Sequence, residues 1–397
     1  MSFTRNASIP IEQTKTTNYI KKELESEKIN VISEAFNWTK SLNIIMKLAF
    51  SIVLIFGILY EVLLIITELL WIILLLDLLL GVILFFILKK MMDLTQIPNI
   101  GKEFESENLI VKIPAMNLKE QRPVLFFSAH SDTVSVRFSF KLIKIVYILG
   151  AILIMTYLIL TLILSIWSLL ALGHLASITN EFLLLQNISF IIGLPIIVEI
   201  VLILLNKRMN QSVGAIDNAS GVAVLIELAK LLNKNPLNNI DVIFLWCSAE
   251  EWGLLGSRQF LSGHFESFNQ TYDLNKSYNI NLDMVGTYIG LVYKTGLLKK
   301  KEMNETLNDV LVAEAKQQNI HLTKAIIPIG AGSDHMSFKS FAKKAEKNIQ
   351  VACFCGTKDT KYIHSIKDTT DLCSSRNLNG CIEICYNTAK SLDIRME

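Results

Sequence analysis

One short stretch organises the whole chain: CSAEEWGLLGS, residues 247–257. The apolar run that precedes it, residues 241–246, is typical of a buried strand. Glu250 and Glu251 therefore follow the carboxyl end of a strand, which is where an α/β sheet places its ligand crevice. Neighbouring side chains of an extended chain point in divergent directions, so one carboxylate can bind a metal while the other reaches a water. Taken alone, the stretch fits a solvated pair of glutamates equally well.

The composition indicates that part of the chain lies in lipid. Of the 397 residues, 51% are hydrophobic and only 19% are charged, which is too apolar for an ordinary soluble enzyme. The net charge is +2 and no basic cluster with interleaved aromatic residues occurs, so nucleic acid is not expected as a partner. The six cysteines lack a zinc-ribbon spacing, and free thiols in a reducing compartment are the simpler interpretation.

Two long apolar segments interrupt the polar sequence. The first, residues 48–88, divides at Thr67-Glu68 into two pieces of about 20 residues, each long enough to cross a bilayer. The second comprises residues 145–164 and 182–205, joined by a connection at 166–181. Because these segments are so long and contain so few polar residues, we expect two transmembrane helical hairpins rather than buried core hairpins.

A few polar residues stand inside these spans. Glu61 and Asp77 lie in the first hairpin, while Pro195 and Glu199 interrupt the last span of the second. A carboxylate within a membrane helix normally faces a partner helix or a wet cavity. We favour helix pairing over a transport site.

The distribution of basic residues predicts the topology. The outer ends of both hairpins are flanked by Lys47, Lys89, Lys90, Lys141, Lys144, Lys207 and Arg208. Both hairpin turns lack lysine and arginine. The positive-inside rule therefore predicts four transmembrane helices with both termini and all polar segments in the cytoplasm. The transmembrane helices also offer a route to a homo-oligomer.

The polar remainder has the pattern of an α/β domain. Strands are expected at residues 29–38, 108–114, 123–129, 241–246, 277–282 and 349–354, and helices at 16–26, 219–232, 302–318 and 377–392. The predicted organisation is one domain, residues 1–43, 91–140 and 207–397, interrupted by hairpins at 44–90 and 141–206.

Titratable residues follow the predicted strands or the loops just beyond them. They are His130 with Asp132, Asp217, Glu250 with Glu251, Asp283 and His364. In a doubly wound sheet these ends converge on one edge. Imidazole and carboxylate are the ligands of zinc and its divalent neighbours. Two histidines and three carboxylates are too many for one catalytic zinc, but they suit two metals about 3.5–4 Å apart with one bridging carboxylate. Asp132 fits a position from which it orients the His130 imidazole.

These residues stand in motifs that resemble peptidase family M28, the co-catalytic dizinc peptidases. The family includes bacterial leucyl aminopeptidases, glutamate carboxypeptidase II and, by divergence, glutaminyl cyclase. The similar motifs are, in order, HSD (130–132), DNASG (217–221), EEWGLLGS (250–257), NLDMVG (281–286), SDHMSF (333–338) and IHSIKDT (363–369). The resemblance covers essentially all the sequence outside the hairpins. It implies a mixed, mostly parallel sheet with helices on both faces, the phosphorylase/hydrolase-like fold of zinc aminopeptidases.

The resemblance also implies the ligands of two zinc ions, which cobalt or manganese could replace. One metal would be held by His130 and Asp283, the other by Glu251 and His364, with Asp217 as the bridge between them.

The other site residues receive supporting or catalytic roles from the same resemblance. Glu250 would be the general base, which takes a proton from the attacking water and passes it to the leaving amine. The peptide bond after Asp217 is commonly cis in the family. His335 belongs to a supporting loop near the substrate and is not assigned as a ligand. His174 and His264 are expected at the surface, and His321 has no assigned role.

The function that follows is a membrane-anchored dinuclear zinc metallopeptidase, most simply an aminopeptidase, whose catalytic domain faces the cytoplasm. Its partners would be a peptide substrate and the lipid bilayer. One alternative is a related amidohydrolase or a glutaminyl-cyclase-like enzyme on the same scaffold. Another is a catalytically silent receptor or scaffold protein, although silent members lose ligands and this chain keeps all five and the base.

Overall fold

The computed structural model describes residues 1–397 except 118, 297, 298, 328–331 and 397. The chain divides into two compact units. The first combines three segments, Met1–Lys40, Leu94–Ser135 and Met209–Glu397. The second comprises Ser41–Asp93 and Val136–Arg208, which contain the two apolar segments.

A mixed sheet forms the centre of the first unit. Its strands are β1 Ile32–Thr39, β2 Glu103–Ile113, β3 Val124–His130, β6 Asp241–Cys247, β7 Tyr278–Asp283, β8 Ile289–Thr295, β9 Lys301–Glu302, β10 Leu322–Ile327 and β11 Gln350–Cys355. Within the described residues the order is β1-β2-β6-β3-β7-β11-β8-β10, and β9 pairs with β8. β6, β3, β7 and β11 are parallel neighbours, and β8 with β10 is a second parallel pair. The short strands β4 Ser135–Val136 and β5 Arg208–Met209 pair separately.

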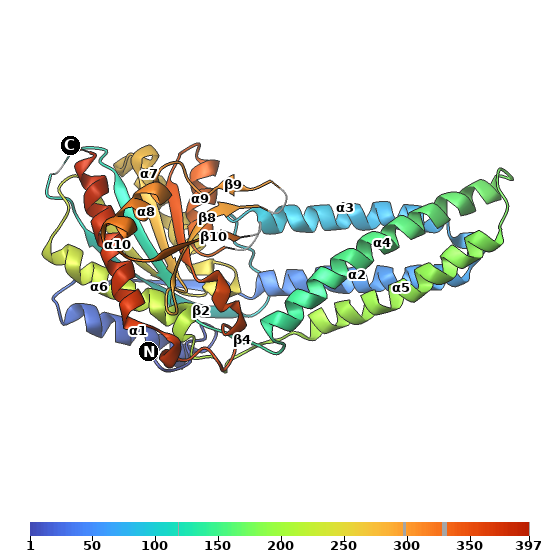
Figure 1. Ribbon diagram of the computed structural model, residues 1–397, viewed down its shortest axis with the longest axis horizontal. Helices are drawn as coiled ribbons and strands as arrows, with labels where there is room; N and C mark the ends of the chain where they lie inside the picture. The colour runs from blue at the N-terminus through green and yellow to red at the C-terminus, as the bar shows by residue number, and fades with distance from the viewer. Residues whose placement is uncertain (118, 297–298, 328–331, 397) are drawn as a thin grey trace. The chain divides into compact units, whose positions relative to one another are not determined.

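Helices cover both faces of the sheet (Figure 1). One face carries α1 Pro10–Glu25, α6 Ser220–Lys234, α8 Leu307–Gln317 and α10 Ser375–Ile394; the other carries α7 Leu255–Thr271 and α9 His335–Lys344. The strands are buried on both sides, because Leu125 and Phe127 of β3 enter one core while Val124 and Phe126 enter the other. A strand covered on both faces is a continuous apolar run in the sequence, which is why β3 and β6 could be predicted. The expected α/β fold class is confirmed.

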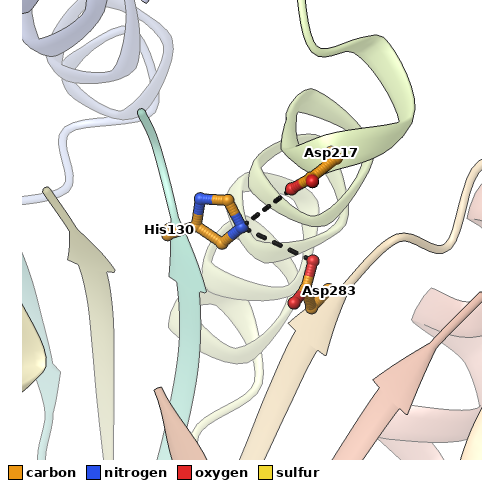
Figure 2. A group of neighbouring side chains, drawn as sticks. All are labelled: His130, Asp217 and Asp283. Atoms are coloured by element: carbon orange, nitrogen blue, oxygen red, sulfur yellow. Dashed lines mark ion pairs between the residues drawn. The ribbon is translucent and has the colours of Figure 1, made fainter. Parts of the chain in front are cut away.

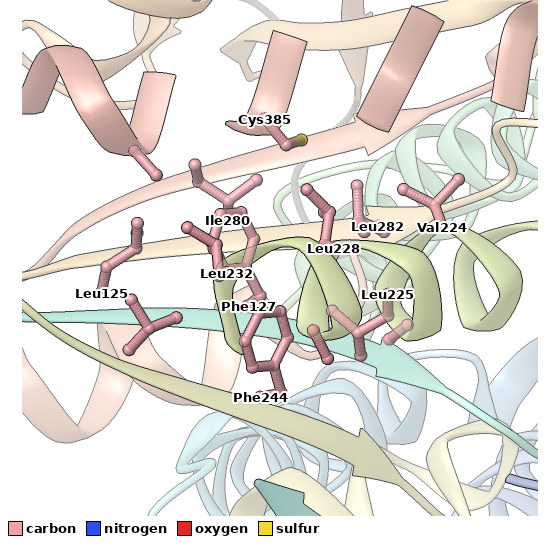
Figure 3. Packing of buried hydrophobic residues seen from close by; sticks show 14 of the residues in the cluster. Leu125, Phe127, Val224, Leu225, Leu228, Leu232, Phe244, Ile280, Leu282 and Cys385 are labelled. Atoms are coloured by element: carbon pink, nitrogen blue, oxygen red, sulfur yellow. The ribbon is translucent and has the colours of Figure 1, made fainter. Parts of the chain in front are cut away.

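The apolar residues of α6 lie on one face of the helix, and that face packs against the sheet. Val222, Leu225, Ala229 and Leu232 recur at helical spacing and are fully buried. Figure 3 shows Leu225 and Leu228 against the sheet residues Phe127 and Phe244, whose rings stack with centroids 5.4 Å apart. Burial of each such side chain contributes about 1.5–3 kcal/mol, so this face fixes α6, and the loop before it, on the sheet.

Several predicted boundaries were wrong, and α7, α9, β8, β10 and the two-residue strands were not predicted. The helix expected at 302–318 begins only at Leu307, because Lys301–Glu302 pairs with β8 as β9. α7 carries Ser, Gly, His and Asn among its apolar positions, which weakens its periodicity in the sequence. The first helix begins at Pro10, where a proline is tolerated because the first turn needs no backbone donor.

The second unit is built from four helices, α2 Ser41–Ile65, α3 Ile72–Met92, α4 Phe140–Leu172 and α5 Asn180–Leu205. Each is long and apolar enough to cross a membrane, with mean hydropathy between 2.5 and 2.9. α4 continues to Leu172 and so absorbs part of the connection expected at 166–181, because its sequence stays leucine-rich to that point. Pro195 does not interrupt the last span but lies inside a continuous α5.

Polar side chains join the helices of this unit. The Tyr60 hydroxyl donates to Asp77 Oδ1 at 2.6 Å and so links α2 to α3. The Tyr157 hydroxyl donates to Glu61 Oε1 at 2.7 Å and links α4 to α2. The rings of Tyr60 and Tyr157 stack with centroids 6.5 Å apart. The expected use of Glu61 and Asp77 in helix pairing is confirmed.

Gly193 of α5 gives a test of this packing. A Cβ at Gly193 would overlap the Glu61 carboxylate and the Tyr157 ring, so Gly193→Ala should break their hydrogen bond. We expect a loss of about 1–3 kcal/mol of stability, measured as thermal unfolding in detergent. Gly81→Ala is the matched control, because a Cβ there meets nothing within 4 Å. Equal melting temperatures for the two variants would contradict this packing.

Candidate active site

The carboxyl ends of the parallel strands carry the candidate residues. His130 is the last residue of β3 and Asp283 the last of β7. Glu250 and Glu251 lie in the short 3-10 turn Glu250–Trp252 just after β6, and His364 lies in the loop beyond β11. Because β6, β3, β7 and β11 run in parallel, these ends lie on one edge of the sheet.

A first group of possible metal ligands consists of His130, Asp217 and Asp283. His130 Nε2 lies 3.1 Å from Asp217 Oδ1 and 3.4 Å from Asp283 Oδ1. Figure 2 shows the imidazole pointing toward both carboxylates, and the three residues come from three different parts of the chain. All three side chains are buried.

A second group consists of Asp217, Glu251 and His364. His364 Nε2 lies 3.1 Å from Asp217 Oδ2 and 3.1 Å from Glu251 Oε1. Asp217 therefore gives one carboxylate oxygen to each group. The His364 side chain is 25% exposed, whereas that of His130 is 1% exposed, so the imidazole of the second group is the more accessible of the two to solvent.

The donor set fits two divalent cations. Asp283 Oδ1 and Glu251 Oε1 are buried and make no hydrogen bond to the described residues, although each faces an imidazole nitrogen. Buried carboxylates gathered in this way are costly unless a cation or donors compensate them. Nitrogen and oxygen donors in groups of three are typical protein ligands of a catalytic zinc, whose fourth position takes water or substrate. The two groups can thus hold two zinc ions.

The loop that carries Asp217 is fixed from two sides. The Asp368 carboxylate accepts the N–H groups of Ile216 and Asp217 at 2.6 and 3.2 Å. Asn218 donates from Nδ2 to the carbonyl of Leu282, next to Asp283. The Asp217–Asn218 peptide bond is cis, as the family resemblance implied. Burial raises the pKa of Asp368 to about 6.

Asp132 acts on its neighbours through two different atoms. His130 Nδ1 lies 3.1 Å from the main-chain carbonyl of Asp132 and 3.7 Å from its carboxylate. The main-chain carbonyl of Asp132 is therefore the hydrogen-bond partner of the ring. The Asp132 carboxylate instead accepts the N–H of Glu250 at 3.0 Å and holds the turn after β6 against His130.

Further contacts fix the turn that carries the two glutamates. Asn108 Oδ1 accepts the N–H of Ser248, and Asn108 Nδ2 donates to the carbonyl of Gly256. A side chain at Gly256 would collide with Asn108 and the backbone of Ser248, so only glycine allows this close approach. Burial raises the pKa of Glu250 well above that of an ordinary glutamic acid; His130 opposes this and the Asp334 carboxylate adds to it.

The remaining histidines lie outside both groups. His335 begins α9 and is fully buried, and its ring nitrogens make no hydrogen bond to the described residues. Burial lowers its pKa to about 3, so the ring is neutral. His264 pairs with Glu34 at 2.6 Å and is only partly exposed, which the sequence did not indicate. His174 and His321 are exposed.

Sequence reasoning missed two residues that support the site. Arg5 donates hydrogen bonds to the loops of His130 and Asp217. Asn108 forms hydrogen bonds to Ser248 and Gly256, on either side of the turn that carries the two glutamates. Both are single polar residues in unremarkable sequence, so only the fold reveals their contacts. Asp368 belongs to the motif IHSIKDT, but its hydrogen bonds to the Asp217 loop could not be inferred from the spacing.

Part of the chain is similar in sequence to known proteins. Residues 201–389 match the sequence model of Peptidase family M28. Aminopeptidase YwaD of Bacillus subtilis (strain 168) is 42% identical over 77 residues, which are 19% of this chain and 16% of that protein. Aminopeptidase Y of Saccharomyces cerevisiae is 29% identical over 154 residues, 36% of this chain and 27% of that protein. The aligned parts thus span less than a third of either relative.

The fold has solved counterparts as well. The crystal structure of an Acidobacteriales bacterium glutaminyl cyclase is similar with a TM-score of 0.52 at 13% identity, and the match covers 99% of this chain and 90% of that one. At this identity the likeness concerns the fold alone. The family match begins near the end of the second apolar segment. Four residues of the ligand groups described above lie within it, namely Asp217, Glu251, Asp283 and His364. Residues 201–389, just under half of the chain, thus match peptidase family M28 in sequence, as the motifs indicated.

Proposed function

We propose that this protein is a membrane-anchored zinc aminopeptidase with a dinuclear centre. His130 and Asp283 hold one zinc, Glu251 and His364 hold the other, and Asp217 bridges them. The observation that carries the proposal is the carboxylate of Asp217, which places one oxygen in each of two ligand groups. The similarity of part of the chain to two curated aminopeptidases supports the choice of substrate class.

Bound zinc would supply a Lewis acid for the scissile carbonyl and a lowered pKa for the attacking water. The chain's own part of the chemistry falls to Glu250, which belongs to neither ligand group and so keeps its carboxylate for proton transfer. Its main-chain N–H is bonded to Asp132, which holds it beside His130. A general base must take a proton from water and return it to the leaving amine, and the carboxylate of Glu250 is free for both steps.

A chelation experiment tests this function. Protein purified in detergent should hydrolyse aminoacyl reporter amides, lose the activity on treatment with 1,10-phenanthroline, and regain it with zinc or cobalt. N-acetylated reporters should not be cleaved if the enzyme needs a free amino terminus. Release of ammonia from an amino-terminal glutamine, without hydrolysis of any reporter, would instead identify a cyclase. A zinc-loaded protein inert toward both substrates would contradict the enzymatic proposal.

The four helices of the second unit are proposed as the membrane anchor. Their length and hydropathy are sufficient to span a bilayer, and the basic residues at their outer ends favour a cytoplasmic first unit. The α4–α5 turn, residues 173–179, would then face the opposite side of the membrane.

Cysteine labelling checks this topology. An impermeant maleimide added to intact cells should label Ser177→Cys, which lies exposed in the α4–α5 turn. It should label Ser26→Cys, exposed at the end of α1, only after the cells are permeabilised. The native cysteines are buried or partly buried, so the unsubstituted chain gives the background. The reverse labelling pattern would contradict the proposed orientation.

A further inference from the structure

A buried arginine ties together the two loops that carry His130 and Asp217. Arg5 is 1% exposed. Its Nε donates to the carbonyl of Ser131 at 2.9 Å, and its Nη1 and Nη2 donate to the carbonyls of Val213 and Gly214 at 2.6 and 2.8 Å. Ser131 follows His130 directly, and Gly214 begins the turn into Asp217. One rigid side chain therefore connects segments that are far apart in the sequence.

The main chain around Arg5 strengthens the same connection. The carbonyl of Arg5 accepts the N–H of Thr133 at 3.1 Å, on the loop after His130. Gly214 has φ 57° and a Cβ there would collide with Thr133, so the two loops are in close contact at this point. The spacing between the loops therefore depends on the segment that carries Arg5.

The charge of Arg5 does not explain its place. Its hydrogen bonds go to main-chain carbonyls, and the carboxylates of Asp368, Asp132 and Asp217 balance its charge only over a longer range. Burial lowers its pKa, but only to about 10, so the guanidinium is charged at neutral pH. A positive charge near a cation site disfavours the cation. Arg5 can therefore help the site only by holding the loops of His130 and Asp217 in position.

We infer that Arg5 is a positioning residue that holds His130 and Asp217 at metal-binding distance and so sets zinc affinity. This inference rests on the proposed two-zinc site. The effect should fall mainly on the group of His130, Asp217 and Asp283, because Asp217 keeps a second anchor in Asp368. Loss of Arg5 leaves the loop after His130 without that side chain's hydrogen bond to Ser131.

Two substitutions separate geometry from charge. Arg5→Lys keeps the charge but loses the planar fork that spans three carbonyls, whereas Arg5→Met removes both. Zinc affinity is measured on the full chain in detergent by competition with a chromophoric chelator, together with zinc content, kcat and KM. We expect both variants to bind the zinc at His130, Asp217 and Asp283 about 10–100-fold less tightly, as is typical when a partner that orients a ligand is lost. The second zinc should be retained.

Arg122→Met is the matched control. Arg122 pairs with Asp241 at 2.5 and 2.8 Å, at the amino ends of β3 and β6, which is the edge of the sheet opposite the site. This variant should unfold at a lower temperature but keep the zinc affinity of the unsubstituted chain.

The results distinguish three possible effects of Arg5 on zinc affinity: through the position of the ligand loops, through its charge, or through the stability of the whole protein. Tighter zinc binding by Arg5→Met, or unchanged binding by Arg5→Lys, would overturn the inference in favour of charge or of no role. An equal loss of affinity in Arg122→Met would reduce Arg5 to a stability effect. If the unsubstituted chain binds two zinc ions and the Arg5 variants lose one, but no form hydrolyses peptides, the inference stands and the proposed activity fails. If the unsubstituted chain binds no zinc, both fail.

Discussion

Replacement of Glu250 by glutamine is expected to lower kcat on an aminoacyl reporter by about 10²–10⁴-fold, the usual contribution of a general base. Glutamine has nearly the same shape but cannot take a proton. Because Glu250 belongs to neither ligand group, the variant should keep both zinc ions. KM should change little, since the lost interaction acts in proton transfer. The measurement is steady-state kinetics together with zinc content by mass spectrometry.

The neighbouring glutamate provides the control. Glu251→Gln makes the same chemical change one residue away, on a side chain that does belong to a ligand group. It should lower zinc content as well as activity. The two variants together test whether the adjacent carboxylates divide their work as proposed. Full activity in Glu250→Gln, or loss of zinc from it, would refute the role assigned to Glu250.

Replacement of Asp217 by asparagine should have the second largest effect. Its two oxygens lie 3.1 Å from His130 Nε2 and from His364 Nε2, so one substitution weakens both ligand groups. An amide supplies only one neutral acceptor in place of two anionic ones. Zinc content should fall from two ions per chain to below one, and activity should be lost with it.

His364→Ala is the matched comparison for Asp217. It removes a ligand from one group only, so one zinc should remain with His130, Asp217 and Asp283. Its activity should also fall, but its zinc content should stay near one ion per chain. If Asp217→Asn retained two zinc ions, the bridging role would be wrong.

The sequence predicts the fold where burial leaves a direct mark. The strands around Phe127 and Phe244 are covered on both faces, so they appear as unbroken apolar runs that end at the candidate residues. Parallel strands gather their carboxyl ends on one edge of a sheet, and this rule alone predicts that His130 and Asp283 lie together. β8 and α7 were missed because half-polar segments obtain their structure from tertiary packing, which a single sequence does not show.

The parts of the site that could not be predicted depend on contacts between distant segments. Arg5 and Asn108 act by hydrogen bonds to main-chain carbonyls and N–H groups, which carry no sequence signature. The partner of the His130 ring is a carbonyl of the same loop, and a motif such as HSD cannot distinguish it from the carboxylate beside it. The apolar helices were predictable in number but not in length, because leucine-rich sequence continues past the expected end of α4.

X-ray diffraction from zinc-loaded crystals at the zinc absorption edge tests the central claim most directly. The account predicts two anomalous peaks about 3.5–4 Å apart, one beside His130 and Asp283 and one beside Glu251 and His364, with Asp217 between them. A single peak, or peaks away from these side chains, would contradict the two-zinc centre on which the proposed function depends.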